Sequence, residues 1–354
     1  MSAPDGSARL GSGRVLVSSK YTAGRRTDSL GDVSDERAGP APDDAEHVHE
    51  GPHGGPGHRH PHPPHDPSGH PRIGFVGAGR VGCALAVAFA TAGWPVAAVA
   101  TRDPARRERF ATLVPGARAV ASPAAITDAV DLVFVTVPDD DLADVAAQLR
   151  LYAGQAAVHT SGALGASVLE PAQAAGTAIG SFHPLVAFAD LEAALAALPG
   201  ATVALEGSEE LLTMLAELAT DIGAQPVRLP PGGKQAYHAA AVLAAGGFVG
   251  LLDAITEAAR GAGLDEAGTL AIYGPLIRGS LANAERLGVE AALTGPFVRG
   301  DEGTVRGHLA ALARLAPGAL PVYRALAQRE LDMAIHRGAL DAGRAAALRR
   351  LLEG

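Results

Sequence analysis

Residues 72–82 read Arg72-Ile-Gly-Phe-Val-Gly-Ala-Gly-Arg-Val-Gly82, and this stretch decides the fold. A short apolar run ends in glycines spaced G-x-G-x-x-G and leads directly into an alanine-rich segment that favours a helix. This order predicts a strand, a tight turn and a helix start, which is the context of a dinucleotide-binding fingerprint. An ordinary turn between a strand and a helix is the alternative reading. The residues of this turn expected to bind a coenzyme are Gly77, Gly79, Arg80, Val81 and Gly82.

The three glycines have separate expected roles. Gly77 permits the turn, Gly79 lets the backbone approach a pyrophosphate, and Gly82 lets helix and strand pack closely. The free N–H groups and the positive end of the following helix would hold the phosphates.

Composition limits the remaining possibilities. With 354 residues the chain is long enough for two or three domains, and 47% apolar residues can form a large core. A net charge of −9 argues against nucleic acid as a partner. Cys83 is the single cysteine, so neither an intramolecular disulfide nor a cysteine zinc site is expected, and we expect no metal centre. No secretory signal is recognised, and the apolar stretch 239–252 is too short to span a bilayer, so we expect a cytoplasmic protein without a membrane contact.

Residues 1–70 form a tail of different composition. They are rich in Gly, Pro, Ser, Asp and His and lack periodic apolar residues, which predicts disorder. Eight of the 13 histidines lie in residues 47–70. Such a tract can collect transition metals, but a solvated low-complexity extension, or a start codon assigned too early, is the favoured explanation. We assign the tail no catalytic role.

The segment after the fingerprint helix indicates which coenzyme is bound. A second strand over residues 94–101 ends at Thr101 and Arg102, and further arginines follow at Arg106 and Arg107. A site that prefers NAD would place a carboxylate at this strand end, whereas guanidinium groups suit the 2′-phosphate of NADP. We therefore expect NADP, bound in part by Thr101, Arg102 and Arg106. NAD stays open as the less favoured coenzyme, because Asp103 follows directly; its other expected role is to cap the next helix.

Three further predicted strands end in small or polar residues. The run 131–137 is apolar, as in a central parallel strand, and stops at Val137 and Pro138, where we expect the loop to pass beneath the coenzyme. The next two strands end near Ser161 and His183. Ligands of open α/β sheets bind outside the carboxyl ends of the strands, so we expect both side chains to contact the substrate. Residues 71–228 would form this α/β domain.

From residue 229 to 354 the pattern is helical, and a long helix begins at Lys234. Lys234 is the only lysine in residues 71–354, which contain 21 arginines. A compact ammonium is needed where a proton is transferred or one oxygen is contacted. His238 is four residues later and shares the same helix face. Lys234 and His238 are therefore the predicted catalytic residues, acting on a carbonyl or an imine.

Two residues further along are predicted to hold the polar end of the substrate. Asn283 is the only asparagine of the chain. Arg299 lies in a compact turn between helices and suits a carboxylate. An exposed helix residue is the alternative for Asn283, and an ion pair with Asp301 is the alternative for Arg299. Asp301 could also cap the helix that leads to His308.

Several motifs together resemble a bacterial family that joins a Rossmann-like domain to domain of unknown function 2520. The matching segments are Gly77-Ala-Gly-Arg-Val-Gly82, His159-Thr-Ser-Gly-Ala163, Gly180-Ser-Phe-His-Pro184, Tyr237-His-Ala-Ala-Ala241 and Leu293-Thr-Gly-Pro-Phe-Val-Arg-Gly-Asp301. The resemblance implies a Rossmann-like dinucleotide-binding domain followed by an all-helical domain. Relatives commonly carry Asn near the position that Gly246 holds here.

More distantly, the layout is similar to β-hydroxyacid dehydrogenases, ketopantoate reductases and pyrroline-5-carboxylate reductases. This similarity implies that Lys234 polarises a substrate oxygen, that the protein is a homodimer, and that the substrate is a small 2-oxo acid such as ketopantoate. An imine reductase of the pyrroline-5-carboxylate type and a dinucleotide-binding regulatory protein without turnover are the alternatives.

Overall fold

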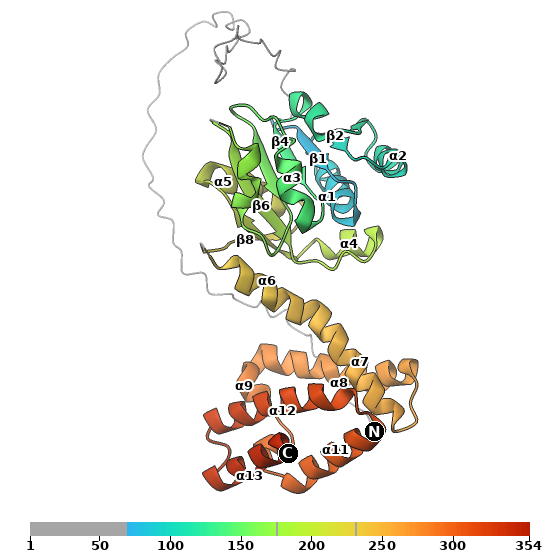
Figure 1. The fold of residues 1–354 in the computed structure, drawn as a ribbon, viewed down its shortest axis with the longest axis vertical. Coiled ribbons are helices and arrows are strands. Elements are labelled where there is room, and N and C mark those ends of the chain that lie inside the picture. The colour runs from blue at the N-terminus through green and yellow to red at the C-terminus, as the bar shows by residue number, and fades with distance from the viewer. Residues whose placement is uncertain (1–68, 175, 231) are drawn as a thin grey trace, which may run out of the picture. The chain divides into compact units, whose positions relative to one another are not determined.

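The computed structural model describes residues 69–354, except residues 175 and 231. The predicted disorder of the tail and its histidine-rich tract thus fall outside the described residues, apart from residues 69 and 70. The described chain forms an eight-stranded sheet and then only helices from residue 234 onward (Figure 1). The predicted order, an α/β part followed by a helical part, is confirmed.

The sheet has the strand order β3-β2-β1-β4-β5-β6-β7-β8. All neighbouring strands are parallel except β6 and β7, which are antiparallel. This reversal places Glu206, the last residue of β7, opposite Ser181 in the middle of β6. The strands are β1 (Ile73–Val76), β2 (Val96–Ala100), β3 (Arg118–Val120), β4 (Leu132–Val135), β5 (Ala156–His159), β6 (Ala178–Pro184), β7 (Thr202–Glu206) and β8 (Gln225–Arg228).

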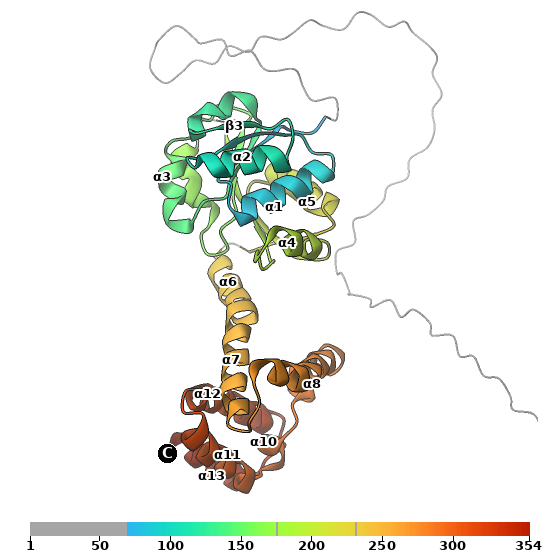
Figure 2. The ribbon, with the colours of Figure 1, turned by 90° about the vertical axis from the view of Figure 1, so that its right-hand side faces the viewer.

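Helices cover both faces of the sheet, because successive strand side chains point to opposite sides. Phe75 and Phe134 pack with residues of α1, α2 and α5 in one core, whereas Val76 and Val133 pack with residues of α3 and η4 in the other. Figure 2 shows α1, α2 and α4 on one side of the strands. The helices are α1 (Arg80–Thr91), α2 (Pro104–Leu113), α3 (Leu142–Ala146), the 3-10 helix η4 (Ala166–Ala172), α4 (Leu191–Ala197) and α5 (Glu209–Asp221).

Stacked phenylalanines fix the central strands against α1. The rings of Phe89 and Phe134 have centroids 5.1 Å apart, and Phe182 meets both rings edge-on. All three side chains are fully buried. Burial of one such side chain contributes roughly 1.5–3 kcal/mol, so this cluster is a large part of what holds β4, β6 and α1 in place.

A single long helix follows the sheet and runs over Lys234–Arg260. It consists of α6 (Lys234–Val242), a π-helical turn η5 (Leu243–Gly247) and α7 (Phe248–Arg260). Gly246 has no other atom within 4 Å of where a Cβ would be, so nothing in the described chain approaches it closely. The helix is long and apolar enough to cross a membrane, yet length and composition alone do not establish a span. It is longer than the apolar stretch recognised in the sequence.

Of the remaining helices, the last four pack into a core of their own. Phe297, Val305 and Leu331 form its centre and are almost fully buried. Asp301 accepts a hydrogen bond from the N–H of Thr304 (3.0 Å), which confirms its predicted role as a helix cap. The helices are α8 (Glu266–Leu287), α9 (Val289–Ala292), α10 (Pro296–Arg299), α11 (Glu302–Leu315), α12 (Ala319–His336) and α13 (Ala342–Glu353).

Candidate functional site

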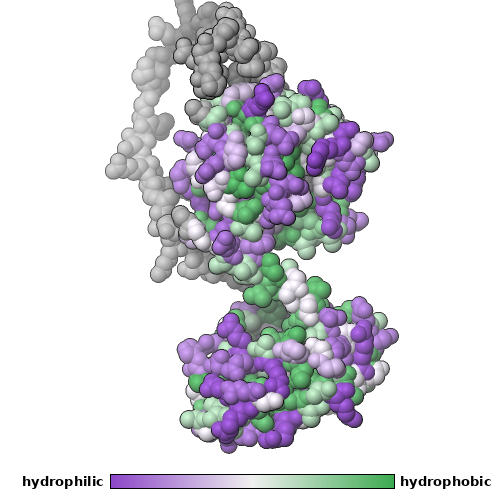
Figure 3. Space-filling view, viewed as in Figure 1, coloured by the Kyte–Doolittle hydropathy of each residue, from purple (hydrophilic) through white to green (hydrophobic). Residues whose placement is uncertain are grey.

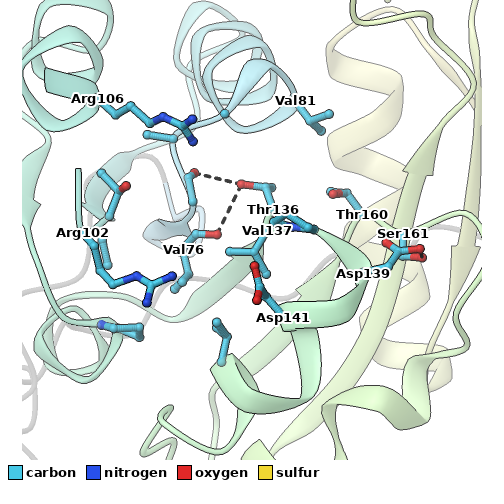
Figure 4. Close-up of a pocket in the computed structure, with 18 of the residues that line it drawn as sticks. Val76, Val81, Arg102, Arg106, Thr136, Val137, Asp139, Asp141, Thr160 and Ser161 are labelled. Carbon is cyan, nitrogen blue, oxygen red and sulfur yellow. Dashed lines mark hydrogen bonds between the residues drawn. The ribbon is translucent and has the colours of Figure 1, made fainter.

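A cavity of about 1050 Å³ lies at the carboxyl ends of β1, β2 and β4, with loop residues that follow β5 in its wall (Figure 4). This is the edge at which ligands of open α/β sheets bind, and the volume suits a large ligand. Most of the predicted coenzyme-binding residues line it. These are Gly77, Gly79, Arg80, Val81, Thr101, Arg102, Arg106, Val137 and Pro138.

The glycine turn is built as the fingerprint requires. Gly77 has a φ of +106°, which favours glycine, and a Cβ there would come within 2.7 Å of the backbone oxygen of Thr136. Gly82 does not line the cavity. A Cβ on it would lie 2.5 Å from Thr136 Oγ1 and 2.6 Å from the Gly77 oxygen, so it serves close packing, as predicted. Gly79 has no protein atom within 4 Å of its Cβ position.

Thr136 is a residue of this turn that the sequence reading missed. Its hydroxyl donates a hydrogen bond to the Gly77 oxygen at 2.9 Å, and thereby ties the end of β4 to the turn after β1 (Figure 4). The N-cap Gly79 has no side chain to bond the first N–H groups of α1. Those donors and the positive end of a 12-residue helix therefore remain available for an anion.

The end of the cavity beside the glycine turn also carries positive charge. Arg102 and Arg106 both line the cavity (Figure 4). Arg107 does not, because its guanidinium donates to the backbone oxygens of Thr101 (2.6 Å) and Arg102 (3.0 Å). Asp103 caps α2 by accepting from the N–H groups of Ala105 and Arg106, which confirms its predicted capping role.

At the other end of the cavity, Ser161 is a hydrogen-bonding centre. It is buried, its hydroxyl donates to Asp139 Oδ2 at 2.9 Å, and it accepts from the N–H of Leu164 at 3.1 Å. Asp139 was not predicted; it directly follows Pro138 and opens the run Asp139-Asp140-Asp141. Ser161 was predicted as a substrate contact, and it does line the cavity.

His159, the last residue of β5, supports the loop that contains Ser161. Its Nδ1 accepts the N–H of Ser161 at 3.1 Å, so its Nε2 carries the proton toward the Gly165 oxygen, also at 3.1 Å. Burial, and next the charge of Lys234, lower the pKa of His159 to about 4. This fully buried imidazole is therefore neutral at physiological pH.

Two further histidines meet beside Gly162. The rings of His183 on β6 and His238 on α6 have centroids 5.6 Å apart at an angle of 75°. A Cβ on Gly162 would lie 2.6 Å from His183 Nε2 and closer still to His238 Nδ1. His238 lines the cavity, whereas His183 lies behind it. The Nδ1 atoms of both rings are buried and have no hydrogen-bond partner among the described residues.

Lys234 is buried beneath these histidines. Its ammonium donates to Ser181 Oγ at 2.5 Å and to Glu206 Oε2 at 2.9 Å, and Ser181 Oγ donates to the same carboxylate at 3.0 Å. Burial lowers the pKa of Lys234, and the hydrogen bond that its ammonium donates to Glu206 opposes that shift. Lys234 is not among the residues that line the cavity. Its predicted catalytic role stays a prediction, and Glu206 is a partner that the sequence did not reveal.

The two predicted residues of the helical part do not line the cavity either. Asn283 is exposed on α8 and accepts a hydrogen bond from Arg286 at 3.1 Å. Arg299 lies 4.0 Å from Asp301, which is the ion pair considered as its alternative role. The described chain thus brings Ser161, His183 and His238 together, but leaves Asn283 and Arg299 apart from them.

Comparisons with known proteins agree with this fold. Residues 66–184 match the Rossmann-like domain, and residues 201–330 match the Domain of unknown function (DUF2520). No curated protein matches the chain. Among solved structures, the chain is similar to a protein from Thermotoga maritima, with a TM-score of 0.58 and 28% sequence identity. That alignment covers 75% of this chain and 99% of the other.

Two solved structures of lower identity share the fold. One is a proposed NADP oxidoreductase from Bacteroides fragilis, with a TM-score of 0.62, 21% identity, and coverage of 74% of this chain and 98% of that one. The other is a reductive aminase from Aspergillus terreus in complex with NADPH and ethyl-5-oxohexanoate. Its TM-score is 0.56 at 18% identity, with 79% of this chain and 99% of that one covered. The chain therefore joins a Rossmann-like domain to the domain of unknown function DUF2520, as its sequence motifs indicate.

Proposed function

We propose that this chain is an NADP-preferring oxidoreductase that reduces a carbon–oxygen or carbon–nitrogen double bond. The observation that carries the proposal is the turn at Gly77–Gly82. Two of its glycines are packed too tightly for a side chain, and the third opens toward the cavity. This cradle fits a pyrophosphate. The similar structures include a proposed NADP oxidoreductase and an NADPH complex, which supports the same coenzyme here.

The preference for NADP is supported by the charges at the outer end of the cavity, which is the end beside the glycine turn. Arg102 and Arg106 line it, and Asp103 lines it too, but the carboxylate of Asp103 is engaged in capping α2 and in an ion pair with Arg106 at 3.3 Å. A 2′-phosphate would thus meet guanidinium groups, while a ribose 2′-hydroxyl would lack a free carboxylate. NAD is accordingly the weaker candidate.

The reduction expected at the inner end of the cavity, which is the end beside Ser161 and His238, needs one proton. When bound, the coenzyme supplies a hydride, so a substrate C=O or C=N group must gain a proton on oxygen or nitrogen. His238 lines the cavity and can donate this proton, which makes it our proposed general acid. Ser161 and Asp139 would orient the substrate beside it, since both line the same wall.

Lys234 is less well placed for direct contact with a substrate. Family resemblance assigns it the polarising role, but two of its three N–H donors are engaged by Ser181 and Glu206, and it does not line the cavity. We therefore place the transferred proton on His238 and treat Lys234 as its support. Asn283 and Arg299 stay predictions as substrate contacts, because neither lines the cavity of the described chain.

For the substrate, a small 2-oxo acid such as ketopantoate is the class that the resemblance implies. An imine is the second candidate, favoured by the similarity to a reductive aminase. The test is NADPH oxidation with a panel of 2-oxo acids, and separately with ketone and amine mixtures that form imines. Turnover with either panel supports a reductase and identifies the class. NADPH binding without turnover on any member would support the non-catalytic alternative.

Assembly as a homodimer is a further part of the proposal. Large apolar side chains of the helix Lys234–Arg260 are exposed, among them Val242, Leu243 and Val249. Hydrophobic residues are visible on the surface of this helix (Figure 3). A second copy would bury them, and a soluble cytoplasmic dimer is the assembly we expect. Light scattering of the parent and of Leu243→Glu should show a dimer and a monomer, respectively. A parent protein that is monomeric at about tens of micromolar would contradict the proposed dimer. So would a parent protein that is recovered with membranes.

A further inference from the structure

Two pairs of side chains connect α6 to β6 at successive levels. On α6, Lys234 and His238 are four residues apart and share one face. On β6, Ser181 and His183 are two residues apart and also share one face. Lys234 contacts Ser181, and His238 contacts His183. Lys234 and Ser181 form the lower pair, and His238 and His183 form the upper pair. The lower pair thus determines how the upper pair meets.

The lower pair is held by a buried charge. Glu206 Oε2 accepts hydrogen bonds from both Lys234 (2.9 Å) and Ser181 (3.0 Å). The side chain of Lys234 is 5% exposed and that of Glu206 is 19% exposed. An ammonium buried to this degree needs its partner, because removing one member of a buried ion pair is strongly unfavourable. Glu206 therefore fixes the first turn of α6 against the sheet.

The upper pair closes the inner end of the cavity. Gly162 leaves no room for a side chain between the two rings, so His238 and His183 are confined by the loop after β5 as well as by each other. Only His238 of the two lines the cavity. A proton carried by the pair can reach a ligand only from that ring.

We propose that Lys234, held by Glu206, is a positioning residue that sets His238 against His183 and keeps His183 uncharged, so that a proton is delivered through His238, the ring that lines the cavity. This rests on the proposed function, in which His238 is the general acid. It assigns Glu206 a role in the reaction although its carboxylate does not line the cavity. It also accounts for a lysine among arginines, because a compact ammonium fits between a strand and a helix.

The electrostatics of His183 agree with this assignment. Its pKa is lowered to about 4, first by burial, then by His238, and then by the charge of Lys234, while Asp139 acts in the opposite direction. Two other titratable groups face His183: the ring of Tyr237, 5.9 Å away between centroids, and His159, whose own pKa the charge of His183 helps to lower. A neutral His183 ring has one donor and one acceptor nitrogen, so it can take either role in a hydrogen bond toward His238.

The decisive experiment is a histidine titration by NMR on the full chain without coenzyme or substrate. His183 is assigned with a His183→Gln variant, and its midpoint is then compared among the parent, Lys234→Met and Glu206→Gln. Loss of the ammonium should raise the midpoint by about one pH unit, the low end of the effect of a nearby charge. Glu206→Gln should give no rise, because Gln still accepts the lysine hydrogen bond and the ammonium keeps its charge.

A purely structural role gives a different result. If the ion pair only held the helix, both variants would admit water to His183, and both midpoints would rise toward 6.5. That outcome, or no change in either variant, would overturn the proposal. Should Lys234→Met fail to fold, the double variant Lys234→Met/Glu206→Gln removes both buried charges and should show the same rise.

Glu209→Gln is the matched control. Glu209 forms an exposed ion pair with Arg228 in the same domain, and its loss should leave the His183 midpoint unchanged. The titration needs no turnover. If the protein reduces no substrate, the proposed function is contradicted. The role of Lys234 is still measured independently by the titration.

Discussion

The two ends of the cavity are built from different parts of the chain. At the outer end, a turn of six residues presents backbone N–H groups, and its shape depends on what glycine lacks. At the inner end, side chains from β6, β7, α6 and the loops after β4 and β5 meet, and the arrangement depends on charge. Substitutions at the outer end should therefore act by steric exclusion of the ligand. Substitutions at the inner end should act by changing protonation.

Gly79→Val tests the outer end most directly. No protein atom lies within 4 Å of the Cβ position, so the fold should tolerate the change, but the new side chain occupies the approach to the N–H groups of α1. Loss of two phosphate hydrogen bonds should weaken NADPH binding by about 100-fold or more. Calorimetry measures the affinity, and thermal unfolding serves as the control. A variant that binds NADPH normally would remove the phosphate site from this turn.

His238→Ala tests the inner end. Loss of a general acid should reduce kcat by about 10²–10⁴-fold, while NADPH affinity should change little because the proposed phosphate contacts lie in the glycine turn. Steady-state kinetics on whichever substrate proves active gives the answer. His336→Ala, which removes an exposed histidine paired with Glu290 on the helical part, is the control. If His238→Ala lowered coenzyme affinity and left kcat intact, the two ends would not be separate.

Stability should depend on pH through the inner end. His159 has a folded-state pKa of about 4, below its ordinary value of 6.5, so the folded state binds fewer protons than the unfolded chain between those values. The free energy of unfolding should therefore fall as pH drops from 6.5 toward 4, by about 3 kcal/mol from this group. Urea unfolding at several pH values measures the slope. It should be shallower in His159→Gln and unchanged in Arg102→Ala; equal slopes in all three would refute the assignment.

The smallest effect concerns coenzyme choice. Arg102→Ala should reduce the preference for NADPH over NADH by about tenfold, the scale of one exposed charged hydrogen bond. Arg109→Ala removes the same charge from α2 at an exposed position that does not line the cavity, and should leave the preference intact. Fluorescence titration with both coenzymes is sufficient. Equal affinities in the parent protein would exclude a 2′-phosphate site at Arg102.

The contrast between the two ends also explains what the sequence could predict. The glycine turn is local, so its spacing predicted Gly77, Gly79 and Gly82 with their separate roles, and the structure confirms the geometry of each. The order of an α/β part and a helical part was equally accessible, because strand and helix periodicities differ. Capping by Asp103 and Asp301 followed from single positions and is likewise found.

The inner end could be predicted only in part. Ser161, His183 and His238 were proposed from strand ends and helix spacing, and they do lie together. Glu206 could not be recognised, because its meeting with Lys234 depends on the reversed direction of β7. A glutamate at a strand end has no distinctive spacing to Lys234. Thr136 and Asp139 were missed for a similar reason, since each acts on a segment more than 20 residues away.

Gly162 has a consequence for how this chain can evolve. Its missing side chain is what allows two imidazoles to share the space beside it. Any larger residue at position 162 would displace His238 or His183, so mutation at this position is conditional on the histidines. In related sequences we expect residue identities at 162, 183 and 238 to vary together. A lineage that replaced the glycine should also have changed the histidines, and with them its source of protons.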